Sequence, residues 1–311
     1  MVKSAIIVSM TDTEKTKLFY RQKVLLGLVE AFGRKLNSTD LQKLLFLYCQ
    51  TYQKAPAYDF VPYRYGCFSF QSYADRNKFT RMNLLADEKN WVLHDDSSYL
   101  DNLPFAESKN IRAFAKQYGS LRGHELIRKV YTEHPYYAIN SELAEELLSD
   151  DELFTVNSQR PRFLEQCFYT IGYEGITFEA YLNKLIQSGV QLLCDVRRNP
   201  ISRKYGFSKK TLSGALENLG IQYLHIPDLG IASAERTSLN NFADYQELFN
   251  RYENTTLAEN HNLVIDFFRL MRDYNRIAIT CFEADSVCCH RGRIAKSLRN
   301  NPDWNYPLIH L

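Results

Sequence analysis

The second half of the chain alternates short apolar runs with helix-forming segments, and this alternation constrains the fold more than any other feature. Five runs have the length and composition of buried strands, namely 167–171, 191–196, 223–226, 277–282 and 308–311. The segments with helical spacing between them are 177–187, 209–218, 242–250, 262–272 and 291–299. Apolar strands separated by helices are typical of a mainly parallel sheet with helices on its faces. We therefore predict an α/β fold for this half.

The first half has a different pattern. Apolar residues recur at helical spacing in 19–32, 41–52 and 71–85, with a loop expected at 60–70. A short strand and turn are expected at 91–97, and helical spacing resumes over 104–150. Helices followed by a short strand and turn predict a mostly helical, winged-helix-like domain. In that arrangement the helix over 41–52 is a candidate for the DNA-recognition helix, although Lys43 is almost its only cation.

The length and one break in the pattern indicate two domains. At roughly 150 residues per domain, a chain of 311 residues is long enough for two hydrophobic cores. The helical spacing stops at a Ser-Gln-Arg-Pro stretch over 158–161, after which the strand-helix alternation begins. We place a helical domain at 1–160 and an α/β domain at 161–311.

Composition excludes several classes of protein. Hydrophobic residues make up 45% of the chain and charged residues 24%, which excludes a disordered or low-complexity chain. No run approaches the roughly 18 apolar residues of a membrane-spanning helix, and no secretory signal is evident. We expect a cytoplasmic protein whose seven cysteines are reduced thiols. The net charge of +2 neither requires nor excludes a polyanionic partner.

Two carboxylates follow predicted strands. Asp195 ends the run at 191–196, and Glu283 follows the run at 277–282. Ligands of open α/β sheets bind beyond the carboxyl ends of the strands, and a buried carboxylate there is costly unless it is paired or functional. Two carboxylates in different environments can divide acid and base roles. The alternative is structural, with Asp195 paired to Arg197 or Arg291 and Glu283 holding Arg291 in place.

A basic loop follows Asp195. It carries six cations and no acidic residue, namely Arg197, Arg198, Arg203, Lys204, Lys209 and Lys210. Guanidinium groups bind phosphate bidentately, and Ser202 would add a donor. Tyr173, in the glycine-flanked turn at 172–175, is a further candidate for substrate contact. The alternative is a loop whose cations are simply solvated.

The segment from 281 to 291 allows three interpretations. Cys281, Cys288, Cys289 and His290 are potential zinc ligands, but adjacent cysteines point in different directions and no second CxxC pair exists. Cys289 at a helix N-terminus beside His290 and Arg291 could instead be a catalytic thiolate. The third interpretation, a helix cap whose His290 and Arg291 contact an anion, is the one we favour, so we predict no metal and no cofactor.

The second half resembles a bacterial and archaeal family, the domain-of-unknown-function family numbered four hundred and eighty-eight. The motifs that carry the resemblance are Thr170–Gly175, Asp195-Val196-Arg197 with Pro200, Ser202-Arg203-Lys204, Gly206–Lys209, Tyr223-Leu224-His225 with Leu229-Gly230, Cys281-Phe282-Glu283 and Cys289-His290-Arg291. The resemblance covers about 168–311. It implies a compact α/β domain with a polar, arginine-rich site and no agreed reaction.

The first half resembles, more loosely, the winged-helix-like domains of bacterial toxin-antitoxin and phage-defence proteins. The resemblance covers about 20–100 and is carried by Leu41–Phe46, Phe60–Tyr63, Tyr65-Gly66 and Phe68-Ser69. Cys67 departs from the proline usual in those domains. The resemblance implies a role in phage defence and DNA binding.

Together these features predict an enzyme that acts on nucleic acid, DNA rather than RNA, or on a nucleotide. Hydrolysis of an N-glycosidic bond fits best, because it needs a carboxylate and cations but no metal. Asp195, Glu283 and His290 are the expected catalytic residues. The expected phosphate or substrate contacts are Tyr173, Arg197, Ser202, Arg203, Lys204, Lys209 and Arg291.

Three alternatives remain open. One is a non-catalytic DNA-binding protein that senses a nucleotide or modified base. Another is a metal-dependent nuclease, which would usually hold Mg²⁺ on clustered carboxylates. The third is that the N-terminal domain binds a protein partner through Tyr63, Tyr65, Phe68 and Phe70.

Overall fold

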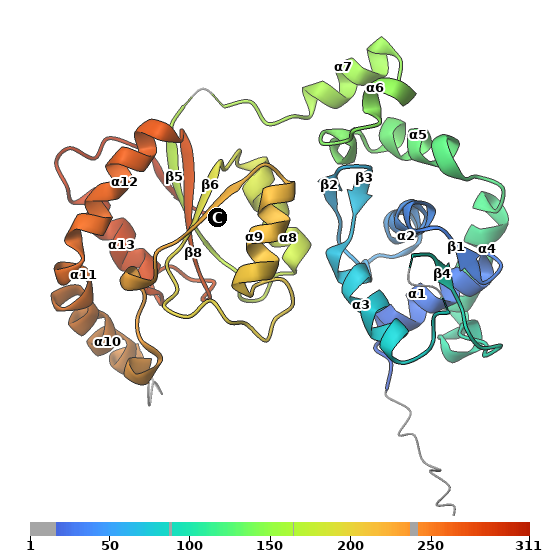
Figure 1. The fold of residues 1–311 in the computed structure, drawn as a ribbon, viewed down its shortest axis with the longest axis horizontal. Helices are drawn as coiled ribbons and strands as arrows, with labels where there is room; N and C mark the ends of the chain where they lie inside the picture. Colours follow the sequence, from blue (N-terminus) through green and yellow to red (C-terminus); the bar gives the residue numbers. More distant parts are fainter. Residues whose placement is uncertain (1–16, 87–88, 164, 237–241) are drawn as a thin grey trace, which may run out of the picture.

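The computed structural model describes residues 17–86, 89–163, 165–236 and 242–311. It shows a mostly helical N-terminal part and an α/β C-terminal part that lie side by side (Figure 1). None of the helices in these ranges is long and apolar enough to cross a membrane.

A five-stranded parallel sheet forms the centre of the C-terminal part, as the alternation predicted. The strand order is β7-β6-β8-β5-β9, and every pairing is parallel. The strands are β5 (Cys167–Gly172), β6 (Leu192–Asp195), β7 (Gln222–His225), β8 (Arg276–Cys281) and β9 (Leu308–His310). The carboxyl ends of β5, β6 and β8 therefore meet at one edge of the sheet.

Helices cover both faces of this sheet (Figure 1). They are α8 (Phe178–Gln187), α9 (Lys209–Asn218), α10 (Phe242–Asn254), α11 (Thr256–Glu259), α12 (His261–Asp273) and α13 (His290–Arg299), with short 3₁₀ turns η3 (Pro227–Leu229) and η4 (Ser233–Arg236). Successive strand residues point to opposite faces, so Ile277 and Ile279 pack with α10–α13 while Ala278 belongs to the cluster on the α8 and α9 side.

The N-terminal part is built around helix α2. Its helices are α1 (Tyr20–Ala31), α2 (Ser38–Tyr52), α3 (Phe70–Arg81), α4 (Phe105–Tyr118), α5 (Gly123–Glu133), α6 (Ala144–Leu147) and α7 (Asp150–Ser158), with 3₁₀ turns η1 (Leu100–Asn102) and η2 (Pro135–Ala138). Asn37 caps α2, because its side chain accepts a hydrogen bond from the Asp40 backbone N–H at 2.7 Å. The helix that begins there is buried on nearly every side, from Asp40 to Cys49.

This burial corrects the assignment of 41–52 as a recognition helix. A recognition helix needs an exposed face to enter the major groove, whereas Lys43 of α2 is only 2% exposed and donates to the Cys67 carbonyl at 3.1 Å. Helix α2 is the central core helix of this part.

Two small antiparallel sheets complete the N-terminal part, and they differ from the predicted loop and wing. The expected loop at 60–70 contains a hairpin of β2 (Val61–Tyr63) and β3 (Gly66–Phe68). The expected wing strand, β4 (Trp91–Val92), pairs with β1 (Lys35–Leu36) just before α2. Trp91 thus closes the core beside α2 and is fully buried.

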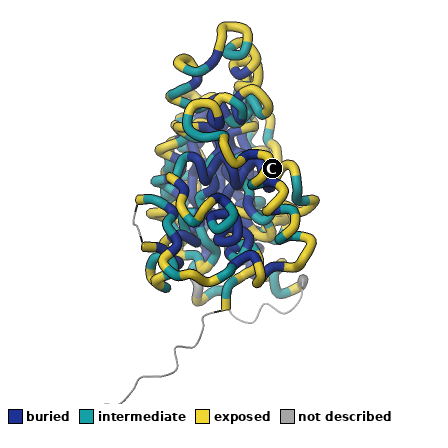
Figure 2. The backbone as a smooth tube through the Cα atoms, turned by 90° about the vertical axis from the view of Figure 1, so that its right-hand side faces the viewer, coloured by how far each residue is buried: buried dark blue, intermediate teal, exposed yellow. Residues whose placement is uncertain are grey.

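The two parts share one apolar cluster, which includes residues of α1–α5 and residues of β5, α8 and α9. Phe70 of α3 packs edge-on against Phe178 of α8, with ring centroids 5.5 Å apart. Seen from the side of the N-terminal part, buried segments fill the interior and exposed ones follow the outline (Figure 2). The segment between the end of α7 and the start of β5 has no helix or strand among its described residues.

A buried carboxylate also joins the two parts. Glu179 of α8 is 1% exposed, and its Oε1 accepts hydrogen bonds from the Gln71 backbone N–H at 2.7 Å and the Ser69 hydroxyl at 3.1 Å. Ser69 is the N-cap of α3, so the carboxylate lies at the N-terminus of that helix. Burial raises the pKa of Glu179 to about 7, more than these hydrogen bonds lower it.

Candidate functional site

The end of β6 carries a buried ion pair. Asp195 is 0% exposed, and the Arg197 guanidinium donates to both of its oxygens, from Nε at 2.8 Å and from Nη2 at 2.5 Å. The Arg197 backbone N–H and the Tyr223 hydroxyl donate to the same carboxylate, at 3.1 and 2.7 Å. Four bonds occupy all of its usual acceptor positions.

Arg197 is committed to this pair and to two further partners. Its Nη1 donates to the Tyr173 hydroxyl and to the Phe207 carbonyl, both at 2.8 Å. Burial alone would lower the pKa of Arg197, but the Asp195 carboxylate outweighs it and raises that pKa. Four of the five guanidinium N–H groups are therefore used internally. This geometry agrees with the structural alternative for Asp195, in which the carboxylate pairs with Arg197.

A cavity of about 330 Å³ opens at the same edge of the sheet. Its lining residues come from four segments of the C-terminal part and are Tyr173, Arg197, Arg198, Asn199, Ile201, Ser202, Arg203, Ile231, Arg236, Cys281 and Phe282. Of the predicted contact residues, Tyr173, Arg197, Ser202 and Arg203 are brought together here. Four guanidinium side chains in one cavity favour an anionic ligand.

The cavity guanidiniums differ in how far they are already paired. Arg198 forms an ion pair with Asp228 at 2.6 Å, in which both side chains are about half exposed. Arg236 pairs with Glu283 at 2.8 Å. Arg203 is exposed, and no ion pair joins it to a described residue. Arg203 is thus the guanidinium most available to a ligand.

Three predicted contact residues do not line the cavity. Lys204 donates from Nζ to the Tyr173 carbonyl at 2.6 Å, and Lys209 lies 3.2 Å from Nδ1 of His225. Arg291 is 1% exposed, and its guanidinium donates to the backbone carbonyls of Glu283 and Ala284. The expectation that Arg291 contacts an anion is therefore corrected: its buried side chain fixes the loop after β8.

Glu283 lies beside the cavity through its ion pair with Arg236. Its side chain is 18% exposed, and Oε2 lies 3.3 Å from the Cys281 sulfur. The end of β5 holds this segment in place, because the Tyr173 and Glu174 backbone N–H groups both donate to the Phe282 carbonyl. A Cβ on Gly172 would lie 1.9 Å from the Glu283 carbonyl oxygen, so only glycine permits this approach.

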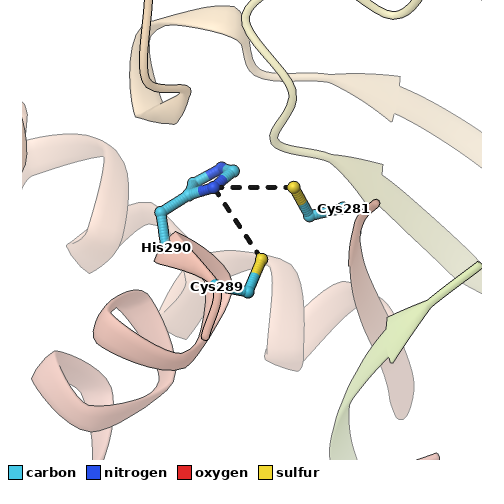
Figure 3. Close-up of side chains that lie close together, drawn as sticks. All are labelled: Cys281, Cys289 and His290. Atoms are coloured by element: carbon cyan, nitrogen blue, oxygen red, sulfur yellow. Dashed lines mark hydrogen bonds between the residues drawn. The ribbon is translucent and has the colours of Figure 1, made fainter. Parts of the chain in front are cut away.

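Cys281, Cys289 and His290 form a buried cluster between β8 and α13 (Figure 3). His290 Nδ1 lies 3.5 Å from the Cys281 sulfur and 3.9 Å from the Cys289 sulfur. Its other nitrogen, Nε2, donates to the Val196 carbonyl at 2.9 Å. Arg236 Nη2 approaches Nδ1 to 3.4 Å. These contacts connect the cluster to the end of β6 and to the cavity.

The thiols and the imidazole perturb one another. Burial would raise the pKa of Cys281, but the hydrogen bond with Cys289 and the charge of His290 outweigh it and lower that pKa well below its usual range. Burial and the neighbouring Cys281 raise the pKa of Cys289. Burial opposes a charged His290, yet Cys281 raises its pKa. Of the two thiols, Cys281 is therefore the one whose surroundings favour the thiolate.

Comparison with known protein families identifies this region. Residues 177–298 match the family described as Domain of unknown function DUF488. The C-terminal part contains a DUF488 domain. This confirms the predicted resemblance over 177–298, whereas the motif at 170–175 and the N-terminal part lie outside the match. No curated protein and no solved structure gives a significant match to the chain.

Two features of the DUF488 domain were missed or misassigned from sequence. Arg236 enters the cavity from η4, which follows the Leu229-Gly230 motif but carries no motif of its own. A thiolate, weighed at Cys289 as an alternative, is favoured at Cys281 instead, because Cys281 has the lowered pKa and lines the cavity. The predicted catalytic His290 is 0% exposed, so its ring acts through its buried neighbours.

Proposed function

We propose that the DUF488 domain hydrolyses an N-glycosidic bond in a nucleotide or in nucleic acid, with DNA as the favoured polymer. The observation that carries the proposal is the cavity in which guanidiniums of Arg198, Arg203 and Arg236 gather beside the Glu283 carboxylate. Guanidiniums suit the phosphate of such a substrate, and a carboxylate suits acid-base work at the sugar.

The step needs one carboxylate and one water molecule. Water attacks the anomeric carbon while the bond from that carbon to the base nitrogen breaks, and its electron pair leaves with the base. Glu283 accepts the proton that the water loses, and this proton then passes through solvent to the nitrogen of the departing base, which returns Glu283 to its carboxylate form. Arg236, which donates to Glu283 at 2.8 Å, holds the carboxylate in position. The products are a free base and an abasic sugar.

The other predicted catalytic residues act through their neighbours under this proposal. Asp195 orients Arg197 and, through it, the Tyr173 ring, which stacks on Phe207 with centroids 4.1 Å apart. Buried His290 connects the end of β6 to the end of β8. Both are positioning residues, and Glu283 is the catalytic one.

The decisive experiment incubates purified full-length protein with plain and base-modified DNA and with nucleotides, with and without Mg²⁺. Mass analysis then identifies any released base, and alkali treatment reveals abasic sites. We expect base release from wild type and its loss in Glu283→Gln. Glu174→Gln is the matched control, because Glu174 accepts the Ala284 backbone N–H at 3.0 Å, whereas Glu283 pairs with the cavity residue Arg236.

Two outcomes would overturn the glycosidase proposal, and a third would overturn only the assignment of Glu283. DNA that binds but stays intact would favour a sensor. Mg²⁺-dependent strand cleavage without base release would favour a nuclease. Base release that survives in Glu283→Gln would remove Glu283 from the acid-base role.

A further inference from the structure

The cluster of Cys281, Cys289 and His290 has the composition and the geometry of a metal site. The two sulfurs and Nδ1 all lie within 4.8 Å of one another, and the three residues are at most 1% exposed. In Figure 3 the imidazole ring lies with Nδ1 toward both sulfurs. Three soft or borderline ligand atoms converge on one point.

The separations agree with tetrahedral zinc coordination. Bonds of about 2.3 Å to sulfur and about 2.0–2.1 Å to nitrogen place sulfur and nitrogen ligands roughly 3.5–3.6 Å apart at a tetrahedral angle. The observed distances from Nδ1 to the sulfurs are 3.5 Å and 3.9 Å. Both distances lie within a few tenths of an ångström of the separation expected around zinc.

The orientation of His290 supports the same conclusion. Its Nε2–H donates to the Val196 carbonyl at 2.9 Å, which leaves the lone pair of Nδ1 toward the sulfurs. Histidines that bind metals commonly donate their other ring N–H to a backbone carbonyl or carboxylate, and this bond fixes the tautomer. The backbone after β6 supplies that partner here.

Charge balance also favours a cation at this point. Binding of a divalent ion would displace the thiol protons and compensate the charge of the thiolates that form, in a thiolate and imidazole ligand set that suits zinc. Glu283 Oε2 lies 3.3 Å from the Cys281 sulfur but is not within range of all three ligand atoms. The described residues thus supply three ligands, which is the number typical of sites whose fourth position takes water.

We infer that Cys281, Cys289 and His290 form a three-ligand zinc site at the border of the arginine-lined cavity. Cys281 belongs to both the cluster and the cavity lining, so the ion would lie next to the ligand-binding space. The inference departs from the expectation that adjacent cysteines disfavour zinc, because it takes the second sulfur from Cys281 and not from Cys288. It stands independently of the proposed glycosidase activity.

The test measures the zinc content of untagged full-length protein after dialysis against a weak chelator. We expect about one zinc ion per chain in wild type and its loss in Cys281→Ser and Cys289→Ser. Cys288→Ser is the matched control: Cys288 adjoins Cys289, is partly exposed and lies outside the cluster, so this variant keeps its zinc. Zinc retained in both cluster variants would overturn the inference.

A second measurement covers variants that fail to fold. Wild-type protein stripped of metal is titrated with Co²⁺, and absorption is recorded in the visible and near ultraviolet. We expect thiolate-to-cobalt charge-transfer and tetrahedral ligand-field bands that saturate at one ion per chain. The site would be overturned if wild-type protein contains no zinc and gives no such bands. This holds whether its thiols are reduced or joined in a disulfide. Neither readout uses a substrate, so failure of the glycosidase proposal does not affect it.

Discussion

The ends of β6 and β8 are neighbours in the sheet, yet their buried polar groups are satisfied in opposite ways. At the end of β6, Asp195 receives four hydrogen bonds from Arg197 and Tyr223. At the end of β8, two thiols and a histidine nitrogen face one another, with the guanidinium of Arg236 at the edge. The first group is saturated within the protein, whereas the second leaves ligand atoms directed at a shared point.

This difference separates groups that hold the fold from groups available for chemistry. A fully hydrogen-bonded buried ion pair gives rigidity and has little capacity left for a ligand. Convergent thiol and imidazole groups at a cavity border have that capacity. The same end-of-strand position thus holds a fully hydrogen-bonded ion pair on β6 and convergent thiol and imidazole groups on β8.

The largest expected effect is on stability, at β6. Asp195→Asn leaves the Arg197 charge buried without a counter-charge, and we expect a loss of about 3–5 kcal/mol in the free energy of unfolding. Urea denaturation followed by circular dichroism measures it. A loss under about 1 kcal/mol would mean that solvent reaches the pair, and the contrast with β8 would fail.

Glu179 is a second buried carboxylate that can be compared with Asp195. Its described hydrogen-bond donors, the Ser69 hydroxyl and the Gln71 backbone N–H, are neutral, whereas Asp195 is bound by a guanidinium. The pKa of Glu179 rises from 4.5 to about 7, so between these values the folded protein keeps a proton that the unfolded chain has released. Stability should therefore fall as pH rises through this window, by up to about 3 kcal/mol. Urea denaturation at pH 5 and pH 8 tests it, and Glu179→Gln should reduce the difference. Equal pH dependence in the two proteins would contradict the prediction.

Removing the carboxylate charge of Glu283, after β8, should lower the free energy of unfolding much less than removing that of Asp195 on β6. Glu283→Gln breaks an ion pair whose side chains are 18% and 33% exposed, and we expect a change of about 0–1 kcal/mol in unfolding free energy. The same urea titration measures it beside Asp195→Asn. A loss as large as that of Asp195→Asn would show that Glu283 is also structural.

The smallest expected effect concerns the exposed cation of the cavity. Arg203→Ala should weaken binding of DNA or nucleotide and reduce the slope of log affinity against log salt by about 1. Fluorescence anisotropy at several salt concentrations measures this slope. Lys210→Ala is the matched control, because Lys210 is exposed in the same basic stretch but does not line the cavity. Equal slopes in the two variants would indicate a loop of solvated cations.

The central strands β5, β6 and β8 could be predicted because each is buried at every position and is therefore mostly apolar, whereas the edge strands β7 and β9 are partly exposed. The N-terminal sheets could not, since β1 and β4 have two residues each and β2 and β3 three. Such strands are too short to show a period of two, and Pro62 in β2 reads locally as a loop residue. The burial of α2 on nearly every side could not be predicted either, because it depends on the helices that surround α2.

The sequence predicted where the polar residues of the candidate site lie in the sheet, but not which of them form ion pairs with one another. The rule that ligands bind beyond strand ends located Asp195, Glu283 and the basic loop correctly at one edge. Which carboxylate binds which guanidinium is a tertiary property, so Arg197 was expected to bind phosphate although Asp195 occupies it. Arg236 could be found only from the structure.

The apolar cluster that runs through both parts has a consequence for cutting the chain. A break between α7 and β5 would give two fragments, and the faces around Phe70 and Phe178 would then be open to water. Neither fragment could complete this shared cluster alone, while each carries the surface that completes the other. The protein is therefore suited to fragment complementation, in which the folding of one piece reports the presence of its counterpart.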